Sequence, residues 1–212
     1  MSVAYSTCER NAAMTRLSSI DPQDWDPELK DAIHPENRTP LENGLMRYFA
    51  HRPDLAKGLM SFSGSLKRNR TLSPRLVELV RLRVAFHNQC RSCMAIRYDD
   101  ALQDGLTEDA VCSLEKPYEA PDLSEAEKAA IRFGELFATN HLDIDDELFE
   151  RLHEHFSEGE ILELAFNAAL FVGIGRLGAV LHMVEELPDA FRSDDVAPAA
   201  VSPWGNESIV VR

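Results

Sequence analysis

One stretch of the chain holds residue types that together could carry out thiol chemistry. Cys90 and Cys93 form a Cys-x-x-Cys pair; His87 lies three residues and Glu78 twelve residues before Cys90. The thiolate is the nucleophilic form of cysteine, and the start of a helix stabilises negative charge. In such a pair one sulfur can attack while the other resolves the product as a disulfide. A carboxylate within reach can shuttle a proton.

Plainer interpretations of the same residues remain open. The cysteines could be buried structural thiols, although adjacent-turn cysteines at a polar break are not typical core residues. A zinc site is less favoured, because Cys90, Cys93 and His87 supply only three ligands and there is no second Cys-x-x-Cys. Glu78 needs a partner if it is buried, so a structural ion pair is as reasonable as catalysis. His87 could be an ordinary helix-end histidine.

These residues are expected to lie on a helical hairpin. The segment that opens at Pro74 predicts a largely buried helix that breaks at 88–89. A second helix is expected from Cys90 to 104–105, where glycine is a common stop. Twelve residues on one continuous helix would separate Glu78 and Cys90 by about 18 Å. An antiparallel hairpin would instead bring Glu78 opposite Arg97 or Tyr98, and we predict an ion pair between Glu78 and Arg97.

The rest of the chain predicts an all-α fold of about eight helices, since no stretch shows sustained β alternation. Residues 1–40 contain four prolines and a weak apolar pattern, and are interpreted as an irregular N-terminal arm. Residues 41–188 are interpreted as the helical domain. Its last helix starts with a capping box at Ser157 and should run to Leu187. Residues 189–212 are interpreted as a tail whose valine-rich end could dock or be disordered.

Composition limits the partners. The length of 212 residues suits one domain with tails, and the net charge of −14 argues against binding to nucleic acid or to an anionic membrane surface. We find no signal peptide in residues 1–21, and no segment reaches the roughly 20 apolar residues of a membrane span. A cytoplasmic protein is therefore expected, in which a Cys-x-x-Cys pair is more often redox-active or metal-binding than structural.

The motif and its surroundings resemble the carboxymuconolactone decarboxylase/AhpD-like superfamily over about residues 40–187. The resemblance implies an AhpD-like helical bundle that assembles as a homo-oligomer: a dimer, a trimer or a hexamer. It also implies a thiol peroxidase that needs no cofactor or metal and takes electrons from an external dithiol such as a lipoyl group. The residues that carry the resemblance are Pro74, Glu78, Cys90, Cys93, Gly105 and Leu106, with the later blocks 160–164 and 173–177.

By the family pattern, Cys93 attacks a hydroperoxide, Cys90 resolves the product and Glu78 relays protons. The chain departs from the pattern at Arg97, where AhpD-like members have a histidine. Arginine cannot relay a proton near neutral pH, although Arg97 could stabilise the Cys93 thiolate and His87 could take over proton transfer. Two alternatives follow: a non-enzymatic redox-sensing oligomer, or a lyase of the decarboxylase branch. The cysteines argue against the lyase, because that branch generally lacks them.

Overall fold

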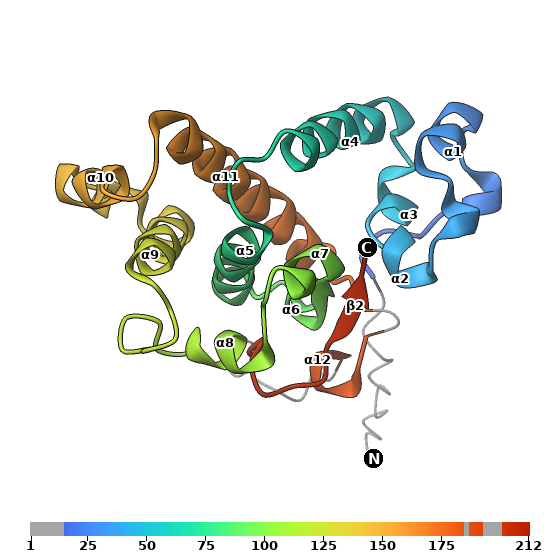
Figure 1. Cartoon of the computed structure of the whole chain (residues 1–212). Helices are drawn as coiled ribbons and strands as arrows, with labels where there is room; N and C mark the ends of the chain where they lie inside the picture. The colour runs from blue at the N-terminus through green and yellow to red at the C-terminus, as the bar shows by residue number, and fades with distance from the viewer. Residues whose placement is uncertain (1–14, 185–186, 193–200) are drawn as a thin grey trace, which may run out of the picture.

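The chain folds into a mainly helical structure, confirming the predicted all-α class (Figure 1). The computed structural model describes residues 15–184, 187–192 and 201–212. Within them, the twelve α-helices exceed the eight expected because several are a single turn. The elements are η1 (Pro22–Asp24), α1 (Pro27–Ile33), η2 (Pro35–Asn37), α2 (Pro40–Asn43), α3 (Met46–Phe49), α4 (Pro53–Arg68), α5 (Pro74–Asn88), α6 (Arg91–Ala95), β1 (Ile96–Tyr98), α7 (Asp99–Gln103), α8 (Glu108–Ser113), α9 (Glu125–Thr139), η3 (His141–Asp143), α10 (Asp146–His153), α11 (Glu158–Val180), α12 (Asp189–Arg192) and β2 (Ile209–Val211).

The core forms where α5 packs between α9 and α11, and Figure 1 shows α5 at the centre of the molecule. The helix carries apolar side chains on most sides, and Leu79, Val80, Leu82 and Val84 are completely buried. A Cβ at Gly134 of α9 would lie 2.6 Å from a methyl carbon of Val80, so a glycine is needed for this close approach. The central position of α5 fixes the direction of every functional side chain on it.

The hairpin begins as expected and then departs from the prediction. The Ser73 hydroxyl caps α5, and Gln89 ends it in the left-handed conformation at φ 51°. Cys90 is the N-cap of the next helix, α6, but that helix lasts only five residues. The chain then becomes extended in β1, and a separate helix, α7, follows. The prediction of one continuous helix from Cys90 to Gly105 was therefore wrong.

The interruption is explained by the C-terminal segment. Strand β2 pairs in parallel with β1, aligning Ile96 with Ile209 and Tyr98 with Val211. The valine-rich end thus docks beside the Cys-x-x-Cys segment and exchanges backbone hydrogen bonds with it. Trp204 also packs on Phe86, with ring centroids 4.8 Å apart. A pairing between segments more than 100 residues apart leaves no local signal, because a three-residue strand shows too little alternation.

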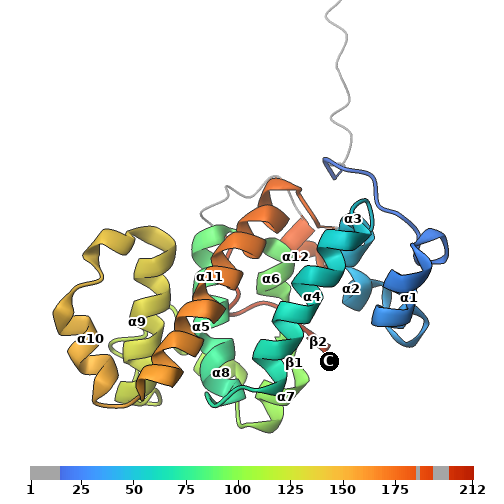
Figure 2. The same ribbon diagram turned by 90° about the horizontal axis from the view of Figure 1, so that it is seen from above.

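The start of the described chain is helical, which corrects the expectation of an irregular segment. Pro22, Pro27, Pro35 and Pro40 each occupy the first turn of a short helix, where the missing N–H costs nothing. The prolines interpreted as breaks are therefore helix starts. Buried apolar side chains of α1 pack against α3 and α4, so this part forms its own small core. Figure 2 shows these helices on the far side of α4 from α11. Residues 1–14 lie outside the described structure.

The long helix α11 also differs from its expected length. It begins at the Ser157 capping box as predicted, but it ends at Val180 rather than at Leu187, and His182 follows at φ 55°. By length and composition α11 could cross a membrane, contrary to the expectation that no segment would qualify. This is weak evidence, since core helices of soluble proteins meet the same criterion. Here α11 packs on α5 and α9.

Candidate functional site

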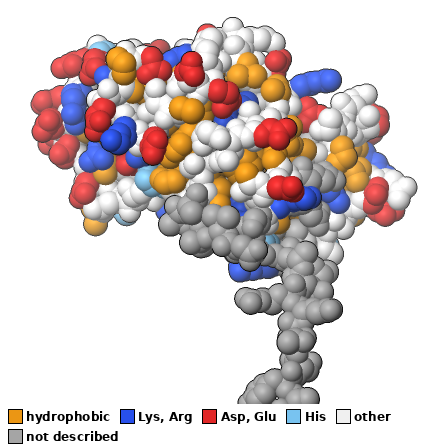
Figure 3. Space-filling model, turned by 90° about the horizontal axis from the view of Figure 1, so that it is seen from below, with side chains coloured by type: hydrophobic (Ala, Val, Ile, Leu, Met, Phe, Trp, Pro, Cys, Tyr) orange, Lys and Arg blue, Asp and Glu red, His pale blue; other side chains and the backbone are white. Residues whose placement is uncertain are grey.

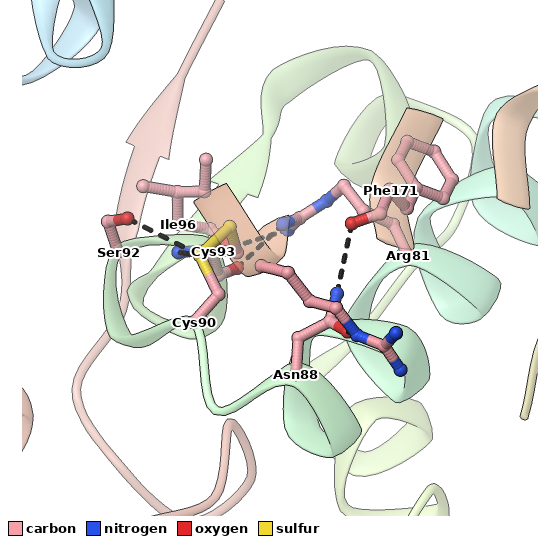
Figure 4. The surroundings of a disulfide bond; sticks show 8 residues. Arg81, Asn88, Cys90, Ser92, Cys93, Ile96 and Phe171 are labelled. Atoms are coloured by element: carbon pink, nitrogen blue, oxygen red, sulfur yellow. Dashed lines mark hydrogen bonds between the residues drawn. A yellow bond between two sulfur atoms is a disulfide. The ribbon is translucent and has the colours of Figure 1, made fainter. Parts of the chain in front are cut away.

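The two predicted redox cysteines are joined by a disulfide at the start of α6 (Figure 4). Cys90 is completely buried, and its sulfur accepts a hydrogen bond from the backbone N–H of Cys93 at 3.4 Å. Cys93 lies one turn further and is only partly buried. The hydroxyl of Ser92 lies 3.6 Å from the Cys90 sulfur. The hairpin turn therefore brings the two sulfurs together and gives them different exposure.

Two glycines of α11 let this turn pack closely against that helix. A Cβ at Gly178 would lie 3.3 Å from the Cys90 sulfur, and a Cβ at Gly175 would lie 2.6 Å from the amide nitrogen of Asn88. Asn88 donates to the Phe171 carbonyl at 3.0 Å and accepts from Arg176 at 3.2 Å. A side chain at either glycine would therefore push α11 away from the redox turn.

A cavity of about 820 Å³ opens beside the disulfide, between α4 and the surface formed by α5, α6 and α11. Cys93 and Ser92 line this cavity, whereas the buried Cys90 does not. Glu78 and Arg81 of α5 lie on the same wall, as does Tyr98 of β1. Of the two cysteines, only Cys93 therefore borders the cavity.

Glu78 is paired with Arg81 and not with Arg97. The two carboxylate oxygens of Glu78 accept hydrogen bonds from Arg81 at 2.6 and 2.7 Å, and one also accepts from the backbone N–H of Tyr98 at 3.2 Å. The predicted ion pair with Arg97 was wrong. Residues three apart on a helix are neighbours, and Arg81 reaches Glu78 without any long-range packing. The spacing was visible in the sequence.

Arg81 links this ion pair to the redox turn. Its guanidinium donates to the carbonyl oxygen of Cys93 at 2.6 Å and to that of Ile96 at 3.0 Å. Both members of the pair are buried, with Glu78 2% and Arg81 6% exposed. Burial alone would lower the pKa of Arg81, but the charge and hydrogen bonds of Glu78 raise it above the ordinary value. Arg81 is the functional-site residue that the prediction missed.

Arg97 fastens the hairpin to the C-terminal segment. It is 1% exposed and donates to Glu108 at 2.9 and 3.2 Å, to the Met94 carbonyl at 2.8 Å and to the Pro203 carbonyl at 2.7 Å. Because Arg97 lies in a strand, its side chain is not directed as it would be in the predicted second helix. The contacts of Arg97 are therefore structural, and none of its hydrogen bonds is with Glu78.

His87 belongs to a different cluster. Its Nε2 lies 3.5 Å from Glu135 of α9, and it does not line the cavity beside Cys93. Glu135 also accepts from Arg83 at 3.0 Å and from the hydroxyl of Tyr118. Burial would raise the pKa of Glu135, but hydrogen bonds from His87 and Tyr118 and the charge of Arg83 lower it to about 2. Burial and the charge of Glu135 raise the pKa of Tyr118.

The structure thus brings together Cys90, Cys93 and Glu78 and separates His87 and Arg97 from them. The catalytic roles predicted for these five residues stay predictions. Within the described ranges, no group of three or more His, Cys, Asp or Glu side chains could hold a metal ion.

Comparisons with known proteins give relatives of similar sequence. Residues 53–136 match the carboxymuconolactone decarboxylase family. An uncharacterized protein of Mycobacterium tuberculosis is 31% identical over 149 residues, which cover 67% of this chain and 51% of the relative. The chain thus spans about half the length of this relative. The uncharacterized protein YdfG of Bacillus subtilis is 28% identical over 118 residues, 55% of this chain and 80% of YdfG.

Two solved structures share the fold. An uncharacterized peroxidase-related protein of Ralstonia eutropha, described as having an alkylhydroperoxidase AhpD core, superposes with a TM-score of 0.68 at 16% identity, covering 90% of this chain and 99% of that one. A protein of unknown function from Agrobacterium tumefaciens, described as a putative antioxidant defence protein AhpD, gives 0.57 at 21% identity, covering 66% and 95%. The family match over residues 53–136 and the shared fold support the resemblance to the carboxymuconolactone decarboxylase/AhpD-like superfamily.

Proposed function

We propose that the protein is a thiol-dependent hydroperoxide reductase that uses the Cys90–Cys93 pair. The observation that carries the proposal is the unequal placement of the two sulfurs: Cys93 lines a large cavity, and Cys90 is buried behind it at bonding distance. A peroxidase of this kind needs one sulfur that meets the substrate and another that only the first can reach. The assignment of Cys93 as the attacking residue follows from this difference.

The proposed cycle reduces a hydroperoxide at Cys93 and ends with the Cys90–Cys93 disulfide. The Cys93 thiolate attacks the distal oxygen of the hydroperoxide, so the O–O bond breaks and an alkoxide leaves, which becomes an alcohol on protonation. Cys93 is now a sulfenic acid. The Cys90 thiol then attacks this sulfur, releasing water and forming the disulfide. An external dithiol reduces the disulfide and returns both thiols. The net reaction converts hydroperoxide and dithiol into alcohol, water and oxidised dithiol.

Arg81 supports the ionised form of Cys93 in this proposal. A guanidinium held against the Cys93 carbonyl places a fixed positive charge beside the residue, and cationic neighbours lower the pKa of a thiol. Glu78 holds the guanidinium in position through two hydrogen bonds. Glu78 is therefore proposed as a positioning residue as well as the relay that the family pattern implies. His87 would act on the cavity only through a rearrangement of its contact with Glu135.

We also propose that the protein works in the cytoplasm as a homo-oligomer. The two long helices α4 and α11 carry exposed apolar side chains, among them Leu55, Leu162, Phe166 and Val180. A contiguous exposed apolar surface is typical of an interaction site. Acidic side chains dominate the left end of the face in Figure 3, where α9 and α10 lie in Figure 1, which agrees with the exclusion of nucleic acid as a partner.

The test is a peroxidase assay with cumene hydroperoxide and dihydrolipoamide, comparing wild type with three cysteine variants. Cys93→Ser should abolish turnover. Cys90→Ser should consume about one equivalent of peroxide and leave a sulfenic acid that dimedone traps. Cys112→Ser is the matched control, because Cys112 is an exposed free cysteine on α8 and its loss should change nothing. If wild type and Cys93→Ser consume peroxide equally slowly, the proposal fails.

A second candidate function is a non-enzymatic redox sensor. It is favoured by the engagement of Glu78 with Arg81 and by the position of His87, which together leave the cavity wall near Cys93 without a free relay. In that case mild oxidation of the reduced protein should form the Cys90–Cys93 disulfide without catalytic turnover. Mass spectrometry of the oxidised protein, combined with the peroxidase assay, distinguishes the two functions.

A further inference from the structure

The cavity beside Cys93 is far larger than hydrogen peroxide or a small alkyl hydroperoxide requires. Its volume of about 820 Å³ lies in the upper part of the roughly 300–1,000 Å³ typical of ligand pockets, whereas one water molecule occupies about 30 Å³ in the liquid. Its walls are mainly apolar and include two methionines of the short helices and α4, whose side chains adapt readily to a ligand's shape. Representative wall residues are Met46, Leu59, Met60, Val77, Phe171 and Ile174. These features suit a long aliphatic chain.

The charge of the cavity differs from that of the whole protein. The chain has 36 acidic and 22 basic side chains, yet the cavity is lined by four acidic and six basic ones. The basic residues are Arg38, Arg47, Lys67, Arg70, Arg81 and Arg212, and the acidic residues are Glu42, Glu78, Asp100 and Glu163. This acidic protein thus has a cavity whose lining side chains carry an excess of positive charge, which favours an anionic ligand.

The four carboxylates on the wall are all engaged. Glu78 is bound by Arg81, and Asp100 lies within 3.2 Å of both Lys67 and Arg70. The remaining two accept hydrogen bonds from the backbone: Glu42 from Thr39 at 2.8 Å and Glu163 from Thr71 at 2.8 Å. Their negative charge is therefore partly compensated before any ligand binds.

The guanidinium of Arg38 is available at the cavity. Among the described residues, the exposed side chain of Arg38 forms no hydrogen bond or ion pair. Arginine offers the planar fork of donors that matches a carboxylate. Arg38 lies between η2 and α2, on the segment that closes the cavity at the side opposite α11.

We propose that the cavity binds an amphipathic anion, a long aliphatic chain that ends in a carboxylate, and that the substrate is a hydroperoxide of this class. The reduction of this substrate rests on the proposed function, whereas the binding of the anion rests on the cavity alone. The aliphatic chain lies along the apolar walls, and the carboxylate binds the guanidinium of Arg38. The hydroperoxide group on the chain meets the Cys93 sulfur. The products are the corresponding hydroxy carboxylate, water and the Cys90–Cys93 disulfide, which the external dithiol reduces.

Binding can be measured without any peroxide. Isothermal titration of the oxidised protein should compare three probes of equal chain length: decanoate, 1-decanol and decyltrimethylammonium. Decanoate should bind at least about tenfold more tightly than the cation. In the reduced protein, saturating decanoate should also slow alkylation of Cys93 by iodoacetamide, a readout that does not depend on peroxidase activity.

Matched variants distinguish the contribution of the apolar wall to decanoate binding from that of the Arg38 charge. Leu59→Glu places a carboxylate on the wall and should weaken decanoate binding more than about tenfold, because burying an unpaired charge is costly. Leu142→Glu is its control, because Leu142 on η3 is 81% exposed and not on the wall. Arg38→Gln should weaken decanoate binding about two- to fivefold, the range of an exposed charge pair, and leave 1-decanol unchanged. Arg151→Gln on α10 is the control for the change of charge.

The outcomes are distinguishable from those of the peroxidase assay. Decanoate binding without peroxide turnover overturns the proposed reductase but keeps the ligand class. Turnover of cumene hydroperoxide without decanoate binding or protection of Cys93 keeps the reductase and overturns the ligand class. Equal affinity for the anion and the cation also overturns it. If light scattering shows an oligomer and decanoate binds only when dilution dissociates it, a second copy fills the cavity and the inference is refuted.

Discussion

Removing the guanidinium of Arg81 should strongly destabilise the protein, because it breaks a buried ion pair. The substitution Arg81→Met leaves the buried carboxylate of Glu78 with one backbone N–H as its partner. It also leaves the carbonyl oxygen of Cys93 without its donor, whereas the carbonyl oxygen of Ile96 keeps a hydrogen bond from Arg97 at 3.0 Å. Breaking a buried ion pair costs about 3–5 kcal/mol, and an unsatisfied buried carbonyl adds about 1–3 kcal/mol. The loss is therefore a large fraction of a typical stability of about 5–15 kcal/mol.

Urea unfolding of the oxidised protein measures this loss, and a double-mutant cycle identifies its origin. If the pair is the cause, Glu78→Leu combined with Arg81→Met should cost less than Arg81→Met alone, because the second change removes the stranded charge. The milder Glu78→Gln keeps the site measurable if Arg81→Met does not fold. Arg52→Met, which removes an exposed partner of Asp54, should leave stability unchanged. An unfolding free energy of Arg81→Met equal to that of wild type would refute the reasoning, as would additive costs in the double variant.

Three further predictions use other parts of the structure. The pKa of Glu135 is lowered to about 2, so its contribution to stability should be complete above about pH 4.5 and be lost as the pH falls toward 2; Glu135→Gln should flatten this part of the unfolding profile. Gly178→Ala should destabilise by about 1–3 kcal/mol through its contact with Cys90, whereas Gly173→Ala, with open space around it, should stabilise by about 1 kcal/mol in urea unfolding. Arg97→Met removes the donor to the tail, so hydrogen exchange at Val211 should accelerate at least tenfold while exchange in the middle of α9 stays unchanged.

The sequence predicted what depends on short-range signals. The helix start at Pro74, the cap at Ser157, the break at Gln89 and the position of Cys90 at a helix start all follow from residues within a few positions of each other. The disulfide partners follow from the same turn. Each of these is decided by the backbone hydrogen-bonding needs of a helix end, which the local sequence states directly.

The predictions failed where the structure depends on distant segments or on strand geometry. Arg97 was assigned to a helix because the residues from Cys90 onward lack a breaker, and only pairing with β2 makes them extended. Once the backbone is extended, successive side chains point to opposite faces, and the pairing of Glu78 with Arg97 is lost. The actual partner, Arg81, was available from helical spacing alone. A charged residue three positions away on the same helix is a nearer partner for Glu78 than one across the hairpin turn.

The contacts of Arg97 also explain how this chain can differ from the family pattern without losing the site. A histidine at this position could not span Glu108, Met94 and Pro203 at once, because it has two ring nitrogens where arginine has five donors. These bonds hold the C-terminal strand against the redox turn, and that strand contributes Val211 to the cavity wall. On the proposed function, arginine at this position cannot relay a proton, but it holds the C-terminal strand that forms part of the cavity wall. Arginine at position 97 would then explain two properties: specificity for a bulky substrate and slower protonation of the leaving alkoxide.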